Sequence, residues 1–379
     1  PLFRIDGGFR AACLETDAMR GIMVDAPDLA KEVILALLLE PRPPKMEPDY
    51  SRDRSRLEGA VSLEQDYGFY PRFYTRGPFL LFLRVNPSAG LLTIVRLLDF
   101  ATERWMETHY KEAHRRSGVE IPLAVGKKCF IGDADVFHWY HGASRSNTVS
   151  SALMAVEKWL YEHCEKSEGI DRWINLFMES SQSMAFLGML CEIGRYSPGL
   201  FTGVLKPLLL VPDTYYLEAT YAAQGGSQFG TPVSFREGEW FFRLAREWDT
   251  MGHRKRRLVD IAAHLFHRHK ETREALLSAR ELWSSISKKG DERWRRHTET
   301  LIATFSEENW KEVESPDGSK LLAYEEPDHL KTSPDQLERS EKEILLLTLP
   351  MTCRQMIDKR SSLNEEEIPE FVRKSKDLV

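Results

Sequence analysis

Apolar side chains recur every three or four residues over residues 147–212, which is the period of an amphipathic helix. One apolar stripe runs from Val149 to Cys164 and a second from Ile170 to Met178. Glu157 is among the charged residues expected on the solvent side of the first stripe. Residues 184–193 are apolar nearly all round, as in a helix that packs on every side. The pattern predicts three consecutive helices here, followed by a fourth.

The fourth helix is predicted to begin at Ser197-Pro198 and to end or kink at Pro207, because proline fits the first turn of a helix but not its interior. Helices joined by such short turns lie antiparallel to their neighbours, and stacked hairpins of this kind build solenoids. We therefore expect a mainly α fold of stacked antiparallel helical hairpins. This would be an irregular α-solenoid of the HEAT or armadillo type, with small β-hairpin inserts.

The chain also aligns with itself. Pro27–Pro41 matches Pro198–Pro212 in its proline and leucine positions, and a weaker copy begins at Asn86-Pro87. Either the chain carries an irregular internal repeat, or leucine-rich helices align here by chance.

Changes in period and composition divide the chain into five regions. Strand-like runs at 119–125, 129–131 and 136–140 predict a small β insert, and Pro316-Asp317-Gly318 predicts the turn of a second hairpin. Further helices are expected near 10–40, 236–248, 253–268, 271–287 and 291–305. The expected regions are N-terminal helical hairpins over 1–112 with a polar linker near 42–62, the β insert over 113–145, a central helical repeat region over 146–305, the β-hairpin over 306–328 and a charged helical tail over 329–379.

Composition argues against some classes of function but does not identify one. The 379 residues carry a net charge of −6, which argues against nucleic-acid binding over the whole surface but not against a local basic patch. The five cysteines are widely spread and have no metal-ligand spacing, as expected of reduced thiols in a cytoplasmic protein. No apolar run approaches the length of a membrane helix, so no membrane partner is expected. Because the sequence begins at Pro1 in mid-pattern, we expect it to be a piece of a longer polypeptide.

Two stretches are candidate binding surfaces. An aromatic group around Pro71 is either a loop packed on the helices or an exposed surface for a protein partner. A basic strip over 253–296 is either a solvated face or a set of contacts to nucleic-acid phosphates. The aromatic group comprises Tyr67, Phe69, Tyr70, Phe73 and Tyr74, and the strip comprises Arg254, Lys255, Arg256, Arg257, Arg293, Arg295 and Arg296.

Candidates for catalysis are weak. No P-loop motif occurs, and Ser144 lies in a sequence that lacks the last glycine of a nucleophile elbow. His264 and His267 share one helix face at a spacing that a metal can use, with Asp260 one turn earlier and His269 nearby. A second acidic and histidine-containing group, Asp133 and Asp135 with His138 and His141, is explained more simply by an aspartate-rich turn. A metal-dependent hydrolase built on either pair of histidines stays open as an alternative.

The central helices resemble a segment of large bacterial ATP-binding proteins that are similar to the NACHT/STAND class of signal-transduction ATPases. The resemblance covers about 130–212 well and the rest of the chain loosely. It is carried by Gly132-Asp133, Trp139, Ser151–Tyr161 (SALMAVEKWLY), Ser183–Leu190 (SMAFLGML), Pro198–Phe201 and Pro207–Leu209.

In that class the segment is an α-helical region separate from the nucleotide-binding module. The nucleotide motifs are absent from this sequence, so the resemblance assigns no catalytic, cofactor-binding or metal residue here and implies ATP and magnesium only in a flanking domain. It implies a non-catalytic recognition or scaffold region, sensor-like, in bacterial defence or stress signalling. The expected partner is a protein or the chain's own flanking NTPase domain. A nucleic-acid-binding helical domain using the basic strip is the alternative.

Overall fold

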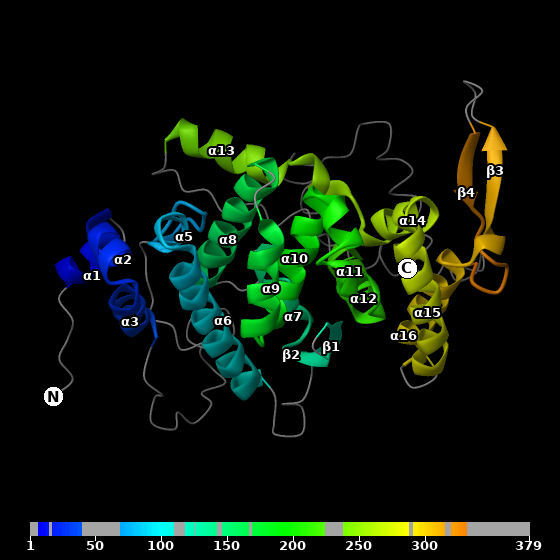
Figure 1. Ribbon diagram of the computed structural model, residues 1–379, viewed down its shortest axis with the longest axis horizontal. Helices are drawn as coiled ribbons and strands as arrows, with labels where there is room; N and C mark the ends of the chain where they lie inside the picture. Colours follow the sequence, from blue (N-terminus) through cyan, green and yellow to red (C-terminus); the bar gives the residue numbers. More distant parts are fainter. Residues whose placement is uncertain are drawn as a thin grey trace, which may run out of the picture. The chain divides into compact units, whose positions relative to one another are not determined.

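The computed structural model describes residues 7–14, 17–39, 69–109, 118–124, 126–141, 146–166, 169–223, 238–287, 291–314 and 320–331 (Figure 1). These residues are mainly helical and include two small antiparallel hairpins, as the sequence predicts. The chain divides into two compact units, Pro1–Phe305 and Ser306–Val379. The predicted linker near 42–62 lies outside the described residues.

The first unit begins with short helices followed by a helical hairpin. α3 packs against α6, and α5 packs against α6 and α8. Proline opens both α3 and α6, where its missing N–H costs no hydrogen bond. The bounds are α1 Gly7–Leu14, η1 Asp17–Met19, α2 Arg20–Asp25, α3 Pro27–Leu38, α5 Phe79–Val85 and α6 Pro87–His109.

The β insert forms one hairpin and then turns helical. β1 (Gly118–Leu123) pairs antiparallel with β2 (Gly126–Ile131), and Gly126 closes the turn with a φ of 124°. The predicted strand over 136–140 is wrong, because α7 (Ala134–Phe137) and η4 (Trp139–His141) occupy it. The Asp133 carboxylate accepts a hydrogen bond from the Val136 amide and so caps α7. A short apolar run fits a strand and a buried helical turn equally well, and this cap favours the helix.

The first three central helices are confirmed, and they lie next to one another in the first unit (Figure 1). Asp99 of α6 fixes the turn that joins the second to the third: its Oδ1 accepts hydrogen bonds from Ser181 Oγ at 2.8 Å, Gln182 N at 3.0 Å and Ser183 N at 3.1 Å. At Gly188, a Cβ would lie 2.1 Å from the Phe137 carbonyl oxygen, so this helix meets α7 with its backbone. The bounds are α8 Asn147–Lys166, α9 Ile170–Ser180 and α10 Met184–Tyr196.

The predicted fourth helix is broken. Pro198 opens a 3-10 turn, η5 (Pro198–Thr202), and Pro207 lies in the first turn of α11 (Lys206–Leu209) instead of ending a helix. α12 (Pro212–Ala223) follows, within the predicted helical region 146–305 but at a stretch where no individual helix was predicted. The two aligned stretches therefore differ in structure, since Pro27–Leu38 forms one continuous helix and residues 198–209 do not.

Helices also complete the first unit, near the positions predicted. α14 packs against α15, and α15 packs against α16. The predicted helix over 253–268 is interrupted after its first turn, because residues 256 and 257 are extended. The bounds are α13 Glu239–Asp249, η7 Gly252–Lys255, α14 Leu258–Arg268, α15 Lys270–Ile286 and α16 Glu292–Thr304.

The second unit contains the predicted hairpin. η9 (Glu307–Asn309) leads into β3 (Trp310–Glu314), which pairs antiparallel with β4 (Lys320–Tyr324). The Trp310 and Tyr324 rings lie 5.5 Å apart across the pair. The helical tail predicted over 329–379 falls outside the described residues beyond Lys331.

Candidate functional site: a buried ion cluster

Charged side chains gather inside the first unit, where α8, α10, α12 and η7 meet. Three are carboxylates, two are guanidiniums and one is an imidazole. The Glu157 and Glu192 side chains are 0% exposed, and Arg254, the most exposed, is 11% exposed. We call the following six residues the ion cluster: Glu157, Glu192, Arg195, Glu218, His253 and Arg254.

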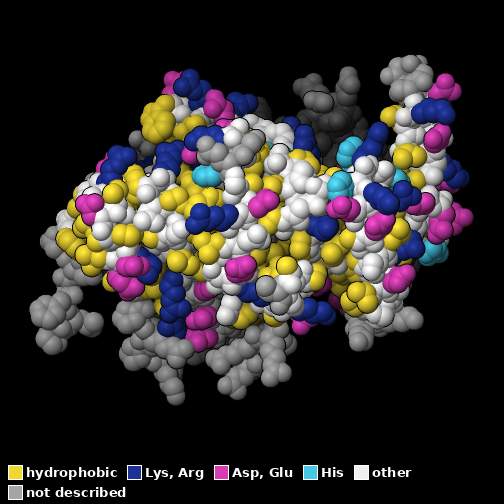
Figure 2. Space-filling view, viewed as in Figure 1, with side chains coloured by type: hydrophobic (Ala, Val, Ile, Leu, Met, Phe, Trp, Pro, Cys, Tyr) yellow, Lys and Arg dark blue, Asp and Glu magenta, His cyan; other side chains and the backbone are white. Residues whose placement is uncertain are grey.

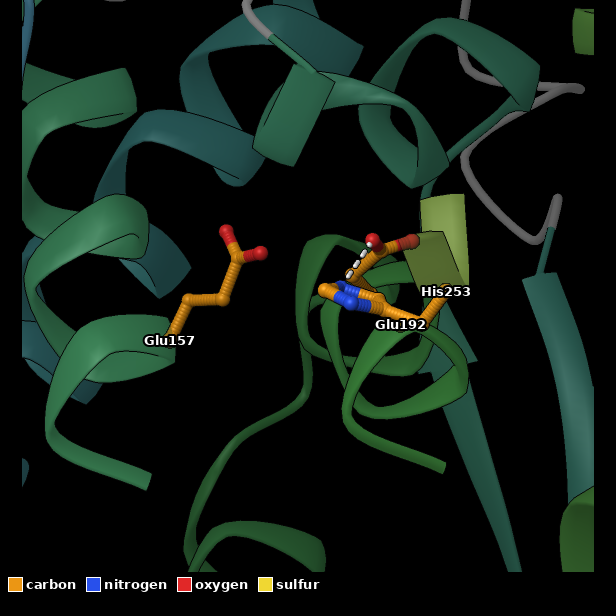
Figure 3. Close-up of side chains that lie close together, drawn as sticks. All are labelled: Glu157, Glu192 and His253. Atoms are coloured by element: carbon orange, nitrogen blue, oxygen red, sulfur yellow. Dashed lines mark ion pairs between the residues drawn. The ribbon is translucent and has the colours of Figure 1, made fainter. Parts of the chain in front are cut away.

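Helix geometry explains how the elements present these groups. Glu192 and Arg195 are three residues apart on α10, so they share one face and form an ion pair within it. Glu157 lies one turn before Tyr161 on α8, a helix that is buried on nearly all sides. His253 and Arg254 come from the turn η7 and reach toward both helices. In Figure 3, Glu157 approaches from one side, and Glu192 and His253 lie together on the other.

Arg254 joins the two buried carboxylates. Its guanidinium lies 2.6 Å from Glu157 Oε1 and 3.2 Å from Glu192 Oε1. It also donates to the Trp248 carbonyl at 2.9 Å and stacks over the Trp248 ring at 5.0 Å. One arginine therefore connects η7 to α8, α10 and α13. A guanidinium can do this because it is planar and has several N–H donors, whereas the ammonium of a lysine is a single point charge.

Arg195 likewise joins two carboxylates, Glu192 and Glu218, on the other side of the ion cluster. It pairs with Glu192, lies 3.1 Å from Glu218 Oε1 and donates to the Tyr140 hydroxyl at 3.2 Å. Its guanidinium also donates to the Arg256 carbonyl at 3.3 Å. Glu218 in turn accepts from the Leu258 amide at 3.0 Å, at the start of α14. These contacts connect α10 to α12, and they connect both helices to the extended residues 256 and 257 between η7 and α14.

Tyr161 connects the imidazole to a carboxylate. Its hydroxyl donates to Glu157 Oε1 at 2.5 Å, so the oxygen is left to accept from His253 Nε2 at 2.8 Å. His253 Nε2 also lies 3.0 Å from Glu192 Oε1. Glu157, Tyr161, His253 and Glu192 thus form one continuous chain of polar contacts.

The two buried glutamates have opposite tendencies to ionise. Burial raises the pKa of Glu157 to about 7, against the opposing effect of Arg254. Burial alone would also raise the pKa of Glu192, but Arg195 and Arg254 outweigh it and hold this pKa well below its usual value. Glu192 is therefore the anion that both arginines neutralise, whereas Glu157 can hold a proton near neutral pH.

Within the described residues, only Glu157, Glu192 and His253 bring three metal-ligand side chains close enough to share one ion. Their chemistry suits a divalent cation such as zinc. The guanidinium of Arg254, however, already lies on Glu157 Oε1 and Glu192 Oε1. A divalent ion bound by these oxygens would meet a positive charge at hydrogen-bond distance, so the arrangement fits an internal counterion better than a metal centre.

The predicted aromatic surface is largely interior. Phe69 and Phe73 are buried, and Phe73 packs edge-on against Phe241 and Trp248. Tyr74 is half-buried, Tyr70 is exposed, and Tyr67 lies outside the described residues. The packed-loop interpretation is confirmed for Phe69 and Phe73, because both belong to the hydrophobic core.

The predicted basic strip is not exposed along its whole length. Arg254 points inward into the ion cluster, and Arg257 pairs with Asp260 at 2.6 Å. Lys255 and Arg256 are exposed, and so are Arg293, Arg295 and Arg296 on the first turn and a half of α16. Phosphate contacts by these exposed cations stay a prediction.

The histidines singled out from the sequence have other surroundings. His138 is buried, contacts the Leu217 carbonyl at 2.8 Å, and has its pKa lowered by burial to about 4. The ring of His141 lies 3.9 Å from that of Tyr140. His269 caps α15 by accepting from the Thr272 amide, and His264 is exposed.

The acidic candidates of the β insert have structural contacts. Asp133 caps α7 and accepts from the Trp105 indole at 2.9 Å, and Asp135 lies in the first turn of that helix. Ser144 lies outside the described residues.

Sequence reasoning missed the ion cluster. It placed Glu157 on the solvent side of its helix, and the structure shows the opposite. The available signal was the charged pair Glu192 and Arg195 within a run of apolar residues, since buried charges occur when they have partners.

Neither a comparison with models of protein families nor one with curated proteins finds a match to this chain. None of the described helices combines the length and the apolar character that crossing a membrane would need.

Proposed function

We propose that the chain is a non-catalytic recognition or scaffold region of a larger bacterial ATP-binding protein of the NACHT/STAND type. The observation that carries the proposal is the ion cluster. Its guanidiniums are paired with carboxylates of the chain itself, and its contacts join four helical elements. Such a cluster orders helices relative to one another, which is what a scaffold requires.

Packing along the first unit is consistent with an irregular solenoid. α3 contacts α6, α6 contacts α8, α8 contacts α10, and α10 contacts α12 and α14. Several of these pairs join helices that are near neighbours in the sequence, as in repeat proteins. The β insert and the broken segment η5–α11 interrupt this order, so the repeats are unequal.

Exposed apolar side chains supply candidate contacts for a protein partner. Phe9, Val24 and Leu29 are exposed on α1, α2 and α3, and Trp240 and Phe242 are exposed on α13 (Figure 2). Large apolar side chains that remain in solvent are frequent at protein interfaces, and aromatic ones contribute most to binding. We expect α13 to contact the NTPase module or a second protein.

The coding sequence on both sides of this segment tests the proposal. A P-loop module in the same reading frame is the expected result, and a reading frame without any NTPase module would contradict it. If the module is found, it can be produced separately and titrated with this chain. We expect Trp240→Ser to weaken the complex, while Leu92→Ser, an exposed apolar change on α6, leaves it unchanged.

Nucleic-acid binding is a second candidate, favoured by the exposed cations on α16. Reversing the charge at Arg293 and Arg295 should weaken binding of a duplex and flatten its salt dependence. Reversal at Arg257, whose guanidinium is held by Asp260, is the matched control. Equal binding and an equal salt slope in wild type and both variants would remove this candidate.

A further inference from the structure

The ion cluster contains more carboxylates than guanidiniums. Glu157, Glu192 and Glu218 supply three negative charges, and Arg195 and Arg254 supply two positive charges. With a neutral imidazole at His253, the ion cluster would carry one uncompensated negative charge in the interior. An unpaired buried charge is costly, and proteins commonly avoid it by binding a proton.

Other titratable groups around the ion cluster do not supply this charge. Burial raises the pKa values of Tyr140, Tyr161 and Cys191, so these groups stay neutral. Burial lowers the pKa of His141, so this imidazole stays neutral as well. The remaining neighbours are Tyr196 of α10, Asp249 at the end of α13 and Asp260 of α14, and both aspartates are exposed to solvent.

Geometry favours one place for the missing proton. Glu157 Oε2 is buried and has no hydrogen-bond partner among the described residues, so it can carry a proton without breaking a contact. Burial also raises the pKa of Glu218, but Arg195 lies 3.1 Å from its Oε1 and the Leu258 amide donates to its Oε2 at 3.0 Å, so a proton there would break a contact.

We propose that the ion cluster holds one proton at neutral pH, on the buried Glu157 carboxyl, and that loss of this proton releases η7 from α8 and α10. Because Tyr161 and Arg254 both donate to Glu157 Oε1, the proton belongs on Oε2.

Release is expected at η7 because of its position. Its two ion-cluster side chains, His253 and Arg254, are 6% and 11% exposed, and they belong to a single 3-10 turn rather than to a long helix. Moving this turn outward lets water reach the carboxylates without displacing a long helix. The ion cluster would thus make one surface segment of the scaffold sensitive to pH between about 4.5 and 7.

Amide hydrogen exchange tests the proposal on the whole chain. The measurement is the exchange rate of amides 252–258 in wild type and Glu157→Gln at pH 6 and pH 8. Dividing the wild-type rate by the variant rate at each pH cancels the intrinsic pH dependence. Because burial raises the pKa of Glu157 to about 7, the ratio should rise about tenfold between these pH values. Glutamine keeps the shape of the side chain and removes the uncompensated charge.

Glu281→Gln is the matched control, because this exposed carboxyl lies on α15 of the same unit and outside the ion cluster. It should behave as wild type. A wild-type ratio that stays constant from pH 6 to pH 8 would overturn the proposal.

Infrared spectra of the wild-type protein provide an independent test should Glu157→Gln fail to fold. A protonated carboxyl band should be present at pH 6 and diminish by pH 8. Absence of this band at pH 6 would also overturn the proposal.

Discussion

At the scale of single residues, buried polar side chains determine how the helices are joined. Asp99 is the simplest case, because one carboxylate oxygen accepts three hydrogen bonds from the turn between α9 and α10. No hydrophobic pattern could indicate this role, since Asp99 and its partners are more than 80 residues apart in sequence.

We expect Asp99→Ala to lower the free energy of unfolding by about 1–3 kcal/mol, because it leaves the Ser181 hydroxyl and the Gln182 amide without this acceptor, whereas the Ser183 amide still donates to Ser181 Oγ. Urea unfolding measures this loss. Asp28→Ala is the control: its carboxylate is exposed and pairs only with Lys31, so the change should stay within about 1 kcal/mol. Equal losses in the two variants would show that Asp99 does not hold the turn.

Glu157 shows the limit of sequence reasoning at this scale. Its neighbours in sequence, Lys158 and Glu162, are partly exposed and pair with each other, and helical periodicity placed Glu157 beside them. What buries it is Arg254, which lies 97 residues later in the chain. A long-range partner of this kind leaves no local signal at Glu157, so its place in the ion cluster could not be predicted from the sequence, whereas the Glu192–Arg195 pair on α10 could have been noticed.

At the scale of elements, apolar periodicity predicted the long helices well. α8, α9 and α10 begin and end close to the predicted residues because each has a continuous apolar stripe and a clear end signal. Prediction was wrong at 136–140 and at 198–209, where the runs are short and the outcome depends on a cap or on proline positions. Short apolar runs do not distinguish strand, 3-10 turn and helix.

Close packing of α10 gives a prediction at this scale. In Gly188→Ala the new methyl group would lie 2.1 Å from the Phe137 carbonyl oxygen, and both elements would have to separate. We expect a loss of about 1–3 kcal/mol in the free energy of unfolding.

Gly21→Ala is the matched control for Gly188→Ala. Gly21 lies in the exposed helix α2 with no atom near its Cβ position, so alanine should be neutral or stabilise by up to about 1 kcal/mol. A stable Gly188→Ala protein with unchanged unfolding would mean that α7 and α10 are not in backbone contact.

At the scale of the whole molecule, the ion cluster predicts how stability depends on pH. The folded-state pKa of Glu157 is raised to about 7, above the value near 4.5 of the unfolded chain. A raised acid pKa means that the folded state binds the extra proton, so this contribution is complete below about pH 4.5 and is lost as pH rises toward 7.

Glu157→Gln should abolish this contribution. Between pH 5 and pH 7, wild type should lose about 1 kcal/mol of unfolding free energy per pH unit relative to Glu157→Gln. Urea unfolding of both proteins across this range measures the difference. Parallel pH profiles for the two proteins would show that Glu157 ionises in the folded state as it does in the unfolded chain.

In our account, the carboxylates of the ion cluster are neutralised by the chain's own arginines and not by a metal ion. Unfolding of Arg254→Met in urea, with and without a chelator, is the most direct test of this neutralisation. Methionine removes the guanidinium from Glu157 and Glu192, so we expect a loss of about 3–5 kcal/mol. Arg257→Met, which breaks only an exposed pair with Asp260, should lose at most about 1 kcal/mol. The chelator should change neither value nor the wild-type value. A wild-type protein that contains one metal ion per chain and loses stability on chelation would contradict this account.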